Sequence, residues 1–99
     1  MNPEAGLINV NNLNFSLGYN QGNNTLRIFN PQSLEEFNVK IYSSDGRLIQ
    51  NSNIDGTKED INLKIESILA RAAYIVNLTF RQNGHSELSS WSKKLYIGN

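Results

Sequence analysis

Apolar and polar residues alternate with a period of two over most of the chain. In residues 37–41, phenylalanine, valine and isoleucine alternate with asparagine and lysine, and similar runs occupy 13–17, 61–65 and 74–80. Because successive side chains of a strand point to opposite faces, each run predicts a strand with one buried and one solvated face. We expect about seven or eight strands at intervals of about 8–12 residues, which is the spacing of a β-sandwich.

Turn-forming dipeptides separate the predicted strands. Asp45-Gly46 lies between two of them, and Asn83-Gly84 lies between the last two. Both dipeptides tolerate positive φ and therefore suit two-residue hairpin turns. The sequence thus predicts two antiparallel hairpins, each closed by a two-residue loop.

One segment, residues 66–72, interrupts the alternation. It is too short for an independent helix, and we interpret it as a crossover between the two sheets of the sandwich. Tyr74 follows this segment and opens a strand, as the tyrosine of a tyrosine corner does in immunoglobulin-like sandwiches. We therefore expect the Tyr74 hydroxyl to bond to the backbone a few residues upstream.

The composition is that of one folded domain and excludes several classes of partner. The chain has 99 residues, of which 38% are hydrophobic and 18% charged, so we expect a single domain over 1–99 with a flexible start at 1–6. Nine basic residues balance nine acidic ones, so the chain lacks the basic footprint of a nucleic-acid-binding protein. No apolar run approaches the roughly 20 residues of a transmembrane helix.

Residues that could carry catalysis or bind a metal are few and separated. The sequence has no cysteine, and its one histidine, His85, lies at a predicted hairpin tip without a partner to orient it. Residues 55–60 include three carboxylates but lack the regular oxygen spacing of a calcium loop. We therefore predict that the chain is not an enzyme and has no catalytic, cofactor-binding or metal-binding residues.

Four short motifs follow one another along the last three quarters of the chain. The first is an apolar strand that ends at Asn30-Pro31, where proline stops the strand because it has no N–H to donate to a ladder. The second is a strand that ends at the turn Asp45-Gly46-Arg47, which two further apolar residues follow.

The third motif is a short apolar strand at 61–63 and, after a turn, the segment Ala72-Ala73-Tyr74. The fourth is the closing strand at 93–97, which begins with two lysines. In this order the four motifs resemble the type A C-terminal sorting domain of the Bacteroidetes type IX secretion system. The glycine that members of this family have two residues before the tyrosine is Ala72 here.

The resemblance implies an all-β, immunoglobulin-like antiparallel β-sandwich of about seven strands without catalytic activity. It also implies a C-terminal sorting signal that directs a secreted passenger through the periplasm and the outer-membrane translocon to the cell surface. There a sortase-like protease removes the domain. The last strand is expected to be an open edge that a partner could recognise. The residues expected to form part of the export signal are Lys93, Lys94, Leu95 and Ile97.

Two alternatives remain open. In the first, the domain stays uncleaved and binds a periplasmic or surface partner in the secretion machinery or in signalling. In the second, the chain is a fibronectin-like carbohydrate-binding module, which needs a platform of aromatic side chains. The side chains that could form this platform are Tyr19, Tyr42, Trp91 and Tyr96.

Overall fold

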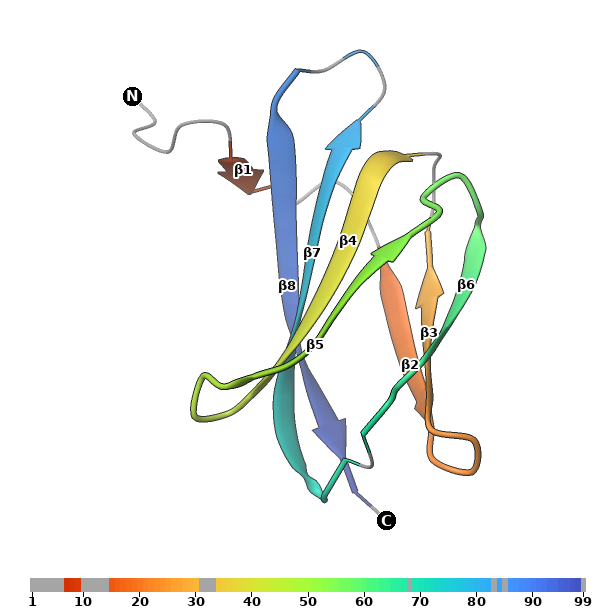
Figure 1. The fold of residues 1–99 in the computed structure, drawn as a ribbon, viewed down its shortest axis with the longest axis vertical. Coiled ribbons are helices and arrows are strands. Elements are labelled where there is room, and N and C mark those ends of the chain that lie inside the picture. The colour runs from red at the N-terminus through yellow and green to blue at the C-terminus, as the bar shows by residue number, and fades with distance from the viewer. Residues whose placement is uncertain are drawn as a thin grey trace.

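The architecture is a sandwich of two β-sheets, drawn in Figure 1 from a computed structural model. The structure describes residues 7–9, 15–30, 34–67, 69–82, 84 and 86–98. Their strands are β1 (Leu7–Asn9), β2 (Ser16–Asn20), β3 (Thr25–Phe29), β4 (Leu34–Ser43), β5 (Leu48–Ile54), β6 (Asp60–Lys64), β7 (Ala72–Gln82) and β8 (Leu88–Ile97). The strand order is β1-β8-β7-β4-β5 in the larger sheet and β2-β3-β6 in the smaller sheet.

The predicted all-β, immunoglobulin-like sandwich is confirmed. The strands from β2 to β8 pair antiparallel within their two sheets. The short strand β1 joins the larger sheet at its edge, where it runs parallel to β8. The alternating runs at 37–41, 61–65 and 74–80 correspond to β4, β6 and β7, so the period of two predicted these strands correctly. The run at 13–17 begins outside the described residues and overlaps β2 only at Ser16 and Leu17.

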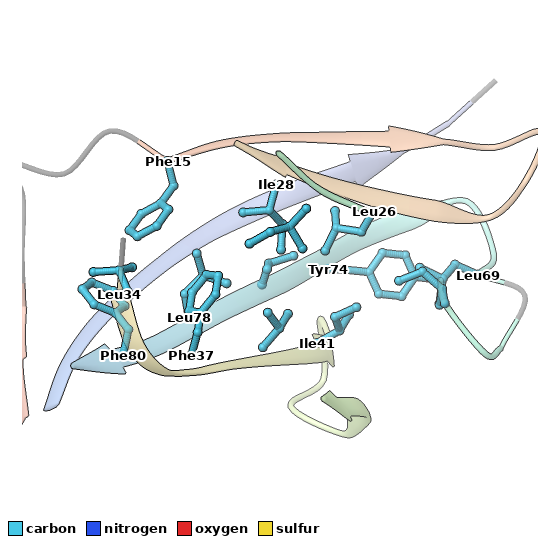
Figure 2. Packing of buried hydrophobic residues seen from close by; sticks show 14 of the residues in the cluster. Phe15, Leu26, Ile28, Leu34, Phe37, Ile41, Leu69, Tyr74, Leu78 and Phe80 are labelled. Atoms are coloured by element: carbon cyan, nitrogen blue, oxygen red, sulfur yellow. The ribbon is translucent and has the colours of Figure 1, made fainter. Parts of the chain in front are cut away.

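The hydrophobic core lies between the two sheets, because the apolar side of each alternating strand faces inward (Figure 2). On β7, every second side chain from Tyr74 to Phe80 is at most 5% exposed. The ring of Phe15, just before β2, lies 6.0 Å from Phe37 and 5.2 Å from Phe80 between centroids, which ties the two sheets together. Each fully buried apolar side chain contributes about 1.5–3 kcal/mol to folding, so this layer is the main source of stability.

The hairpin between β4 and β5 has a longer loop than predicted. The N–H of Ser43 donates to Arg47 O at 2.9 Å, and the N–H of Gly46 donates to Ser43 O at 2.9 Å. Gly46 has a φ of 90°, whereas Asp45 is not among the residues with positive φ. The prediction of a two-residue turn is therefore wrong: Ser44 begins a three-residue loop that ends on glycine in the left-handed conformation.

The hairpin between β7 and β8 also differs from its prediction. Arg81 is paired with Leu88, so residues 82–87 lie between the two paired positions. The two-residue turn predicted for this hairpin is therefore wrong. Asn83 and His85, on which that turn and the predicted hairpin tip were based, lie outside the described residues.

The crossover and the tyrosine corner are confirmed. The segment after β6 leaves the smaller sheet and enters the larger sheet at β7, and its described residues form no helix. The Tyr74 hydroxyl donates to the carbonyl oxygen of Ala70 at 2.7 Å, while the side chain is 5% exposed. This bond fixes the crossover to the strand that follows it.

At the end of the sandwich opposite Tyr74, Asn30 links β3 to the loop between β5 and β6 through hydrogen bonds. Its side chain is 1% exposed, and Nδ2 donates to Gly56 O at 2.8 Å and to Lys58 O at 3.1 Å. Its backbone N–H donates to Glu59 O at 2.7 Å. A Cβ on Gly56 would lie 2.7 Å from a backbone oxygen of β4, so glycine permits this close approach. Asn30 therefore has a structural role, and its neighbour Pro31 lies outside the described residues.

Candidate functional site

The residues of the sequence motifs lie at both ends of the sandwich, and one end gathers most of them. The β4–β5 turn and the beginning of β7, which contains Tyr74, both lie at the lower end in Figure 1. The last part of β8 lies there too, because Leu95 is paired with Tyr74. Asn30 lies at the upper end, beyond β3. The structure thus places Asn30 at the opposite end from Tyr74, although the apolar strands of the first and third motifs are paired, with Ile28 opposite Ile61.

An open-sided hollow of about 590 Å³ lies at this lower end, between the β4–β5 hairpin and the crossover into β7. Its lining includes the buried side chains of Leu69 and Tyr74. The polar residues around it are Ser43, Ser44, Asp45, Arg47 and Ser67. Polar and apolar side chains thus contribute about equally to the lining of this hollow, which is open to solvent.

The two charged side chains beside this hollow differ in their contacts. Ser43 Oγ donates to Asp45 Oδ1, and the N–H of Arg47 donates to the same oxygen at 3.4 Å. These hydrogen bonds stabilise the carboxylate and hold the pKa of Asp45 below its usual range. The Arg47 guanidinium takes part in neither of the two ion pairs between described residues. It is therefore available to an anionic group of a partner.

The outer edge of β8 is open over most of its length. On one side β8 pairs with β7 along the whole strand, and on the other side it pairs with β1 at Leu88–Ser90. In the part of the chain that the structure describes, no strand pairs with the outer edge over 91–97. The expectation of an open edge is therefore wrong at Leu88–Ser90, where β1 lies beside β8 and is the outermost strand of the sheet.

The predicted export-signal residues on β8 have two kinds of environment. Lys93 and Lys94 are exposed, whereas Leu95 packs against the core and Ile97 is 5% exposed. Lys93 is paired with the buried Val76 and shares its inner face, so Lys94 lies on the outer face. The two lysines are therefore available to a partner, while Leu95 and Ile97 anchor the strand.

The aromatic side chains considered for a carbohydrate platform lie in different parts of the structure. Trp91 packs against Phe15 with ring centroids 5.2 Å apart, and Tyr19 is partly buried against the core. Tyr42 and Tyr96 lie on the outer face of the larger sheet, where Tyr96 is 73% exposed. The structure does not bring all four side chains to one surface.

The carboxylates of residues 55–60 make separate local contacts. Asp55 Oδ1 accepts hydrogen bonds from the N–H of Thr57 at 3.0 Å and from its hydroxyl at 2.6 Å. Asp60 forms a two-pronged ion pair with Arg27 at 2.8 and 2.9 Å. Among the described residues, no group of three histidine, cysteine or acidic side chains is placed to hold a metal ion. The described part of the chain also has no helix long and apolar enough to cross a membrane.

Comparison with known proteins gives no relative from which a function could be transferred. No family model matches the chain, and no curated protein matches it. A function for this chain therefore rests on the four sequence motifs, on the fold and on the open edge of β8.

Proposed function

We propose that this chain is a C-terminal sorting domain that directs an attached passenger protein through the type IX secretion system to the cell surface. The outer-membrane translocon recognises the folded domain, and a sortase-like surface protease then removes it. The domain performs no chemistry itself and serves as a binding module for these partners.

The positions of the motif residues support this proposal. Asn30 joins the end of β3 to the β5–β6 loop, Gly46 closes the β4–β5 loop, and Tyr74 holds the crossover. The closing motif, residues 93–97, forms the C-terminal half of β8. Each motif thus contributes to the kind of sandwich that the resemblance implies, which is a reason to keep the function that accompanies it.

The observation that carries the proposal is the outer edge of β8, which over residues 91–97 has no strand paired with it in the described part of the chain. Unpaired N–H and C=O groups of an edge strand form a template that another protein can recognise. Lys93 and Lys94 lie on this part of β8 and are exposed. The hollow beside Arg47 is lined in part by Tyr74, which is paired with Leu95 of β8. One end of the domain therefore offers a backbone edge, cations and a hollow to a partner.

Secretion of a reporter protein with this domain at its C-terminus tests the proposal. The reporter carries a cleavable signal peptide and is produced in two Bacteroidetes hosts, one with an intact type IX translocon and one without it. We expect the reporter at the cell surface in the first host and in the periplasm in the second. A matched fusion to an unrelated β-sandwich should stay in the periplasm of both hosts. Periplasmic retention of the sorting-domain fusion in both hosts would contradict the proposal.

Retention of the domain after export is the alternative within the same proposal. The mass of the surface-exposed reporter distinguishes the two fates. Loss of the 11.2 kDa domain indicates cleavage by the surface protease. An intact fusion indicates that the domain stays attached and binds a surface or signalling partner.

A further inference from the structure

The part of the β8 edge that no described strand covers, over residues 91–97, is long enough for one complete added strand. In an antiparallel sheet, alternate residues of a strand direct their N–H and C=O groups to one neighbour and the others to the opposite neighbour. On one side of β8, the backbone of β7 forms the hydrogen bonds of the ladder. On the other side, no described strand forms such bonds over 91–97. Seven residues exceed the mean strand length of about 5–6 residues, so this edge could support a full ladder.

β1 demonstrates that this edge accepts a strand from elsewhere. It runs parallel to β8, with Leu7 opposite Leu88 and Asn9 opposite Ser90. β1 comes from the other end of the chain and is not joined to β8 by a hairpin. A strand added over 91–97 would lie on the same edge of β8, next to the positions Leu88–Ser90 that pair with β1.

The charge of this edge favours an acidic partner. Lys93 and Lys94 place one ammonium group on each face of the sheet, and neither belongs to an ion pair between described residues. The segment 72–80 of β7 and the whole of β8 contain no acidic residue, so the adjoining strand does not neutralise the lysines. Opposite charges attract across paired strands, whereas like charges repel.

The same lysines oppose pairing with a second copy of this chain. An antiparallel pair of β8 strands that covered all of 91–97 would place Lys94 opposite Lys94 and Lys93 opposite Leu95. Two ammonium groups directly opposite one another destabilise such a pair. Charged side chains on edge strands are a common device against self-association. The occupant of this edge is therefore a strand of a different protein.

From this geometry we infer that β8 binds an extended segment of a partner protein that carries acidic residues opposite Lys93 and Lys94. The segment adds a strand to the larger sheet next to β8. This inference rests on the proposed function, because it states the chemistry that a translocon subunit or another partner would present to the domain.

Amide hydrogen exchange of the domain with a tethered strand tests the inference. The probe is a segment of alternating valine and threonine with a central pair of glutamates, attached after Asn99 through a flexible glycine-serine linker. Tethering raises the effective concentration of the segment to the millimolar range. We expect exchange over 91–97 to slow at least about tenfold at alternate residues, because only these N–H groups face the added strand.

Charge variants separate the role of the lysines from that of the backbone. Lys93→Glu/Lys94→Glu should lose this protection with the glutamate segment and regain it when lysines replace the glutamates. Lys64→Glu, at an exposed position on the edge strand β6 of the smaller sheet, should keep the protection. Unchanged exchange in the unaltered domain, or equal protection by the glutamate and lysine segments, would overturn the inference.

Failure of this inference and failure of the sorting function give different results. Protection by the glutamate segment together with a reporter that stays in the periplasm keeps the strand-binding edge and removes the sorting role. Surface display of the reporter without any protection over 91–97 keeps the sorting role and removes the acidic-strand site.

Discussion

The two lateral sides of the sandwich close in different ways. On one side Gln50 of β5, which is 8% exposed, links the two sheets: Nε2 donates to Lys64 O at 3.1 Å, and Oε1 accepts from the N–H of Glu66 at 2.9 Å. On the other side the edge of β8 carries Lys93 and Lys94, and over 91–97 its outer backbone groups have no described strand beside them. The β5 edge is hydrogen-bonded to the smaller sheet, whereas the β8 edge carries the positive charges of two lysines.

This difference indicates which side stabilises the domain and which side binds a partner. A buried amide that bridges two sheets must keep its hydrogen bonds, because unsatisfied buried polar groups are costly. Exposed lysines contribute little to stability, but they determine which strands can pair with an edge. Changes of the bridging amide on the β5 side should therefore destabilise the domain, and changes of the two lysines on the β8 side should alter recognition alone.

The largest effect is expected from Gln50→Met, which nearly keeps the side-chain volume and removes the hydrogen bonds between the sheets. Lys64 O and the N–H of Glu66 lose a partner, and the free energy of unfolding should fall by about 2 kcal/mol. Urea denaturation measures this change. The control Gln21→Met, in the exposed turn between β2 and β3, should change stability by less than about 0.5 kcal/mol. Equal effects of the two variants would remove the distinction between the two sides.

A smaller loss is expected from Tyr74→Phe, which removes the bond to Ala70 O but keeps the ring in the core. The free energy of unfolding should fall by about 1 kcal/mol, because one buried hydrogen bond is lost. Tyr96→Phe is the matched control, since Tyr96 is 73% exposed and should tolerate the change. If Tyr74→Phe were as stable as this control, packing alone would hold the crossover.

Little change in stability is expected from Lys93→Glu/Lys94→Glu. Both side chains are exposed and make no ion pair between described residues, so reversing their charge should alter the free energy of unfolding by less than about 0.5 kcal/mol. Urea denaturation checks this prediction. A loss similar to that of Gln50→Met would mean that the open edge is also needed for the fold.

The smallest effect is expected from acid, through two exposed ion pairs that each join neighbouring strands of one sheet. Hydrogen bonds from Arg27 and Arg81 lower the pKa values of Asp60 and Glu36, respectively. Each pair stabilises the fold above the unfolded-state pKa of about 4, and this contribution is lost as the pH falls through the lower folded-state pKa.

Urea midpoints between neutral and acidic pH measure this dependence. The double variant Asp60→Asn/Glu36→Gln should show a slightly shallower fall in stability below about pH 4 than the unaltered domain. Identical curves for the two proteins would show that neither ion pair contributes, as is common for exposed pairs.

Local sequence patterns predicted the strands and the tyrosine corner because both depend on nearby residues. A period of two along a strand is set by the backbone itself. The bond of Tyr74 reaches Ala70, which is four residues upstream. The positions of the turns were also predicted, since Gly46 and Gly84 both adopt positive φ.

Loop lengths and links between the sheets depend on the register of whole strands and could not be predicted. An Asp-Gly dipeptide fits both a two-residue turn and the three-residue loop that Gly46 closes. Asn30 and Gln50 bond to backbone groups 26 and 14 residues away, so no local pattern signals their roles. Both are polar residues that an alternating pattern would place on a solvated surface.

The candidate site was predictable only where it depends on local sequence. The last predicted strand was expected to form an edge, and the exposure of Lys93 and Lys94 agrees with this expectation. The parallel pairing of β1 with β8 was not predicted, because no local pattern in Leu7–Asn9 signals its partner strand. The hollow beside Arg47 was missed as well, since it forms between a hairpin and a crossover that are distant in sequence.

Secretion of the reporter by charge variants of the domain tests the central claim most directly. The unaltered domain and Lys64→Glu should bring the reporter to the cell surface, whereas Lys93→Glu/Lys94→Glu should leave it in the periplasm as a folded fusion. Surface display of the Lys93→Glu/Lys94→Glu fusion at the level of the unaltered domain would contradict the account.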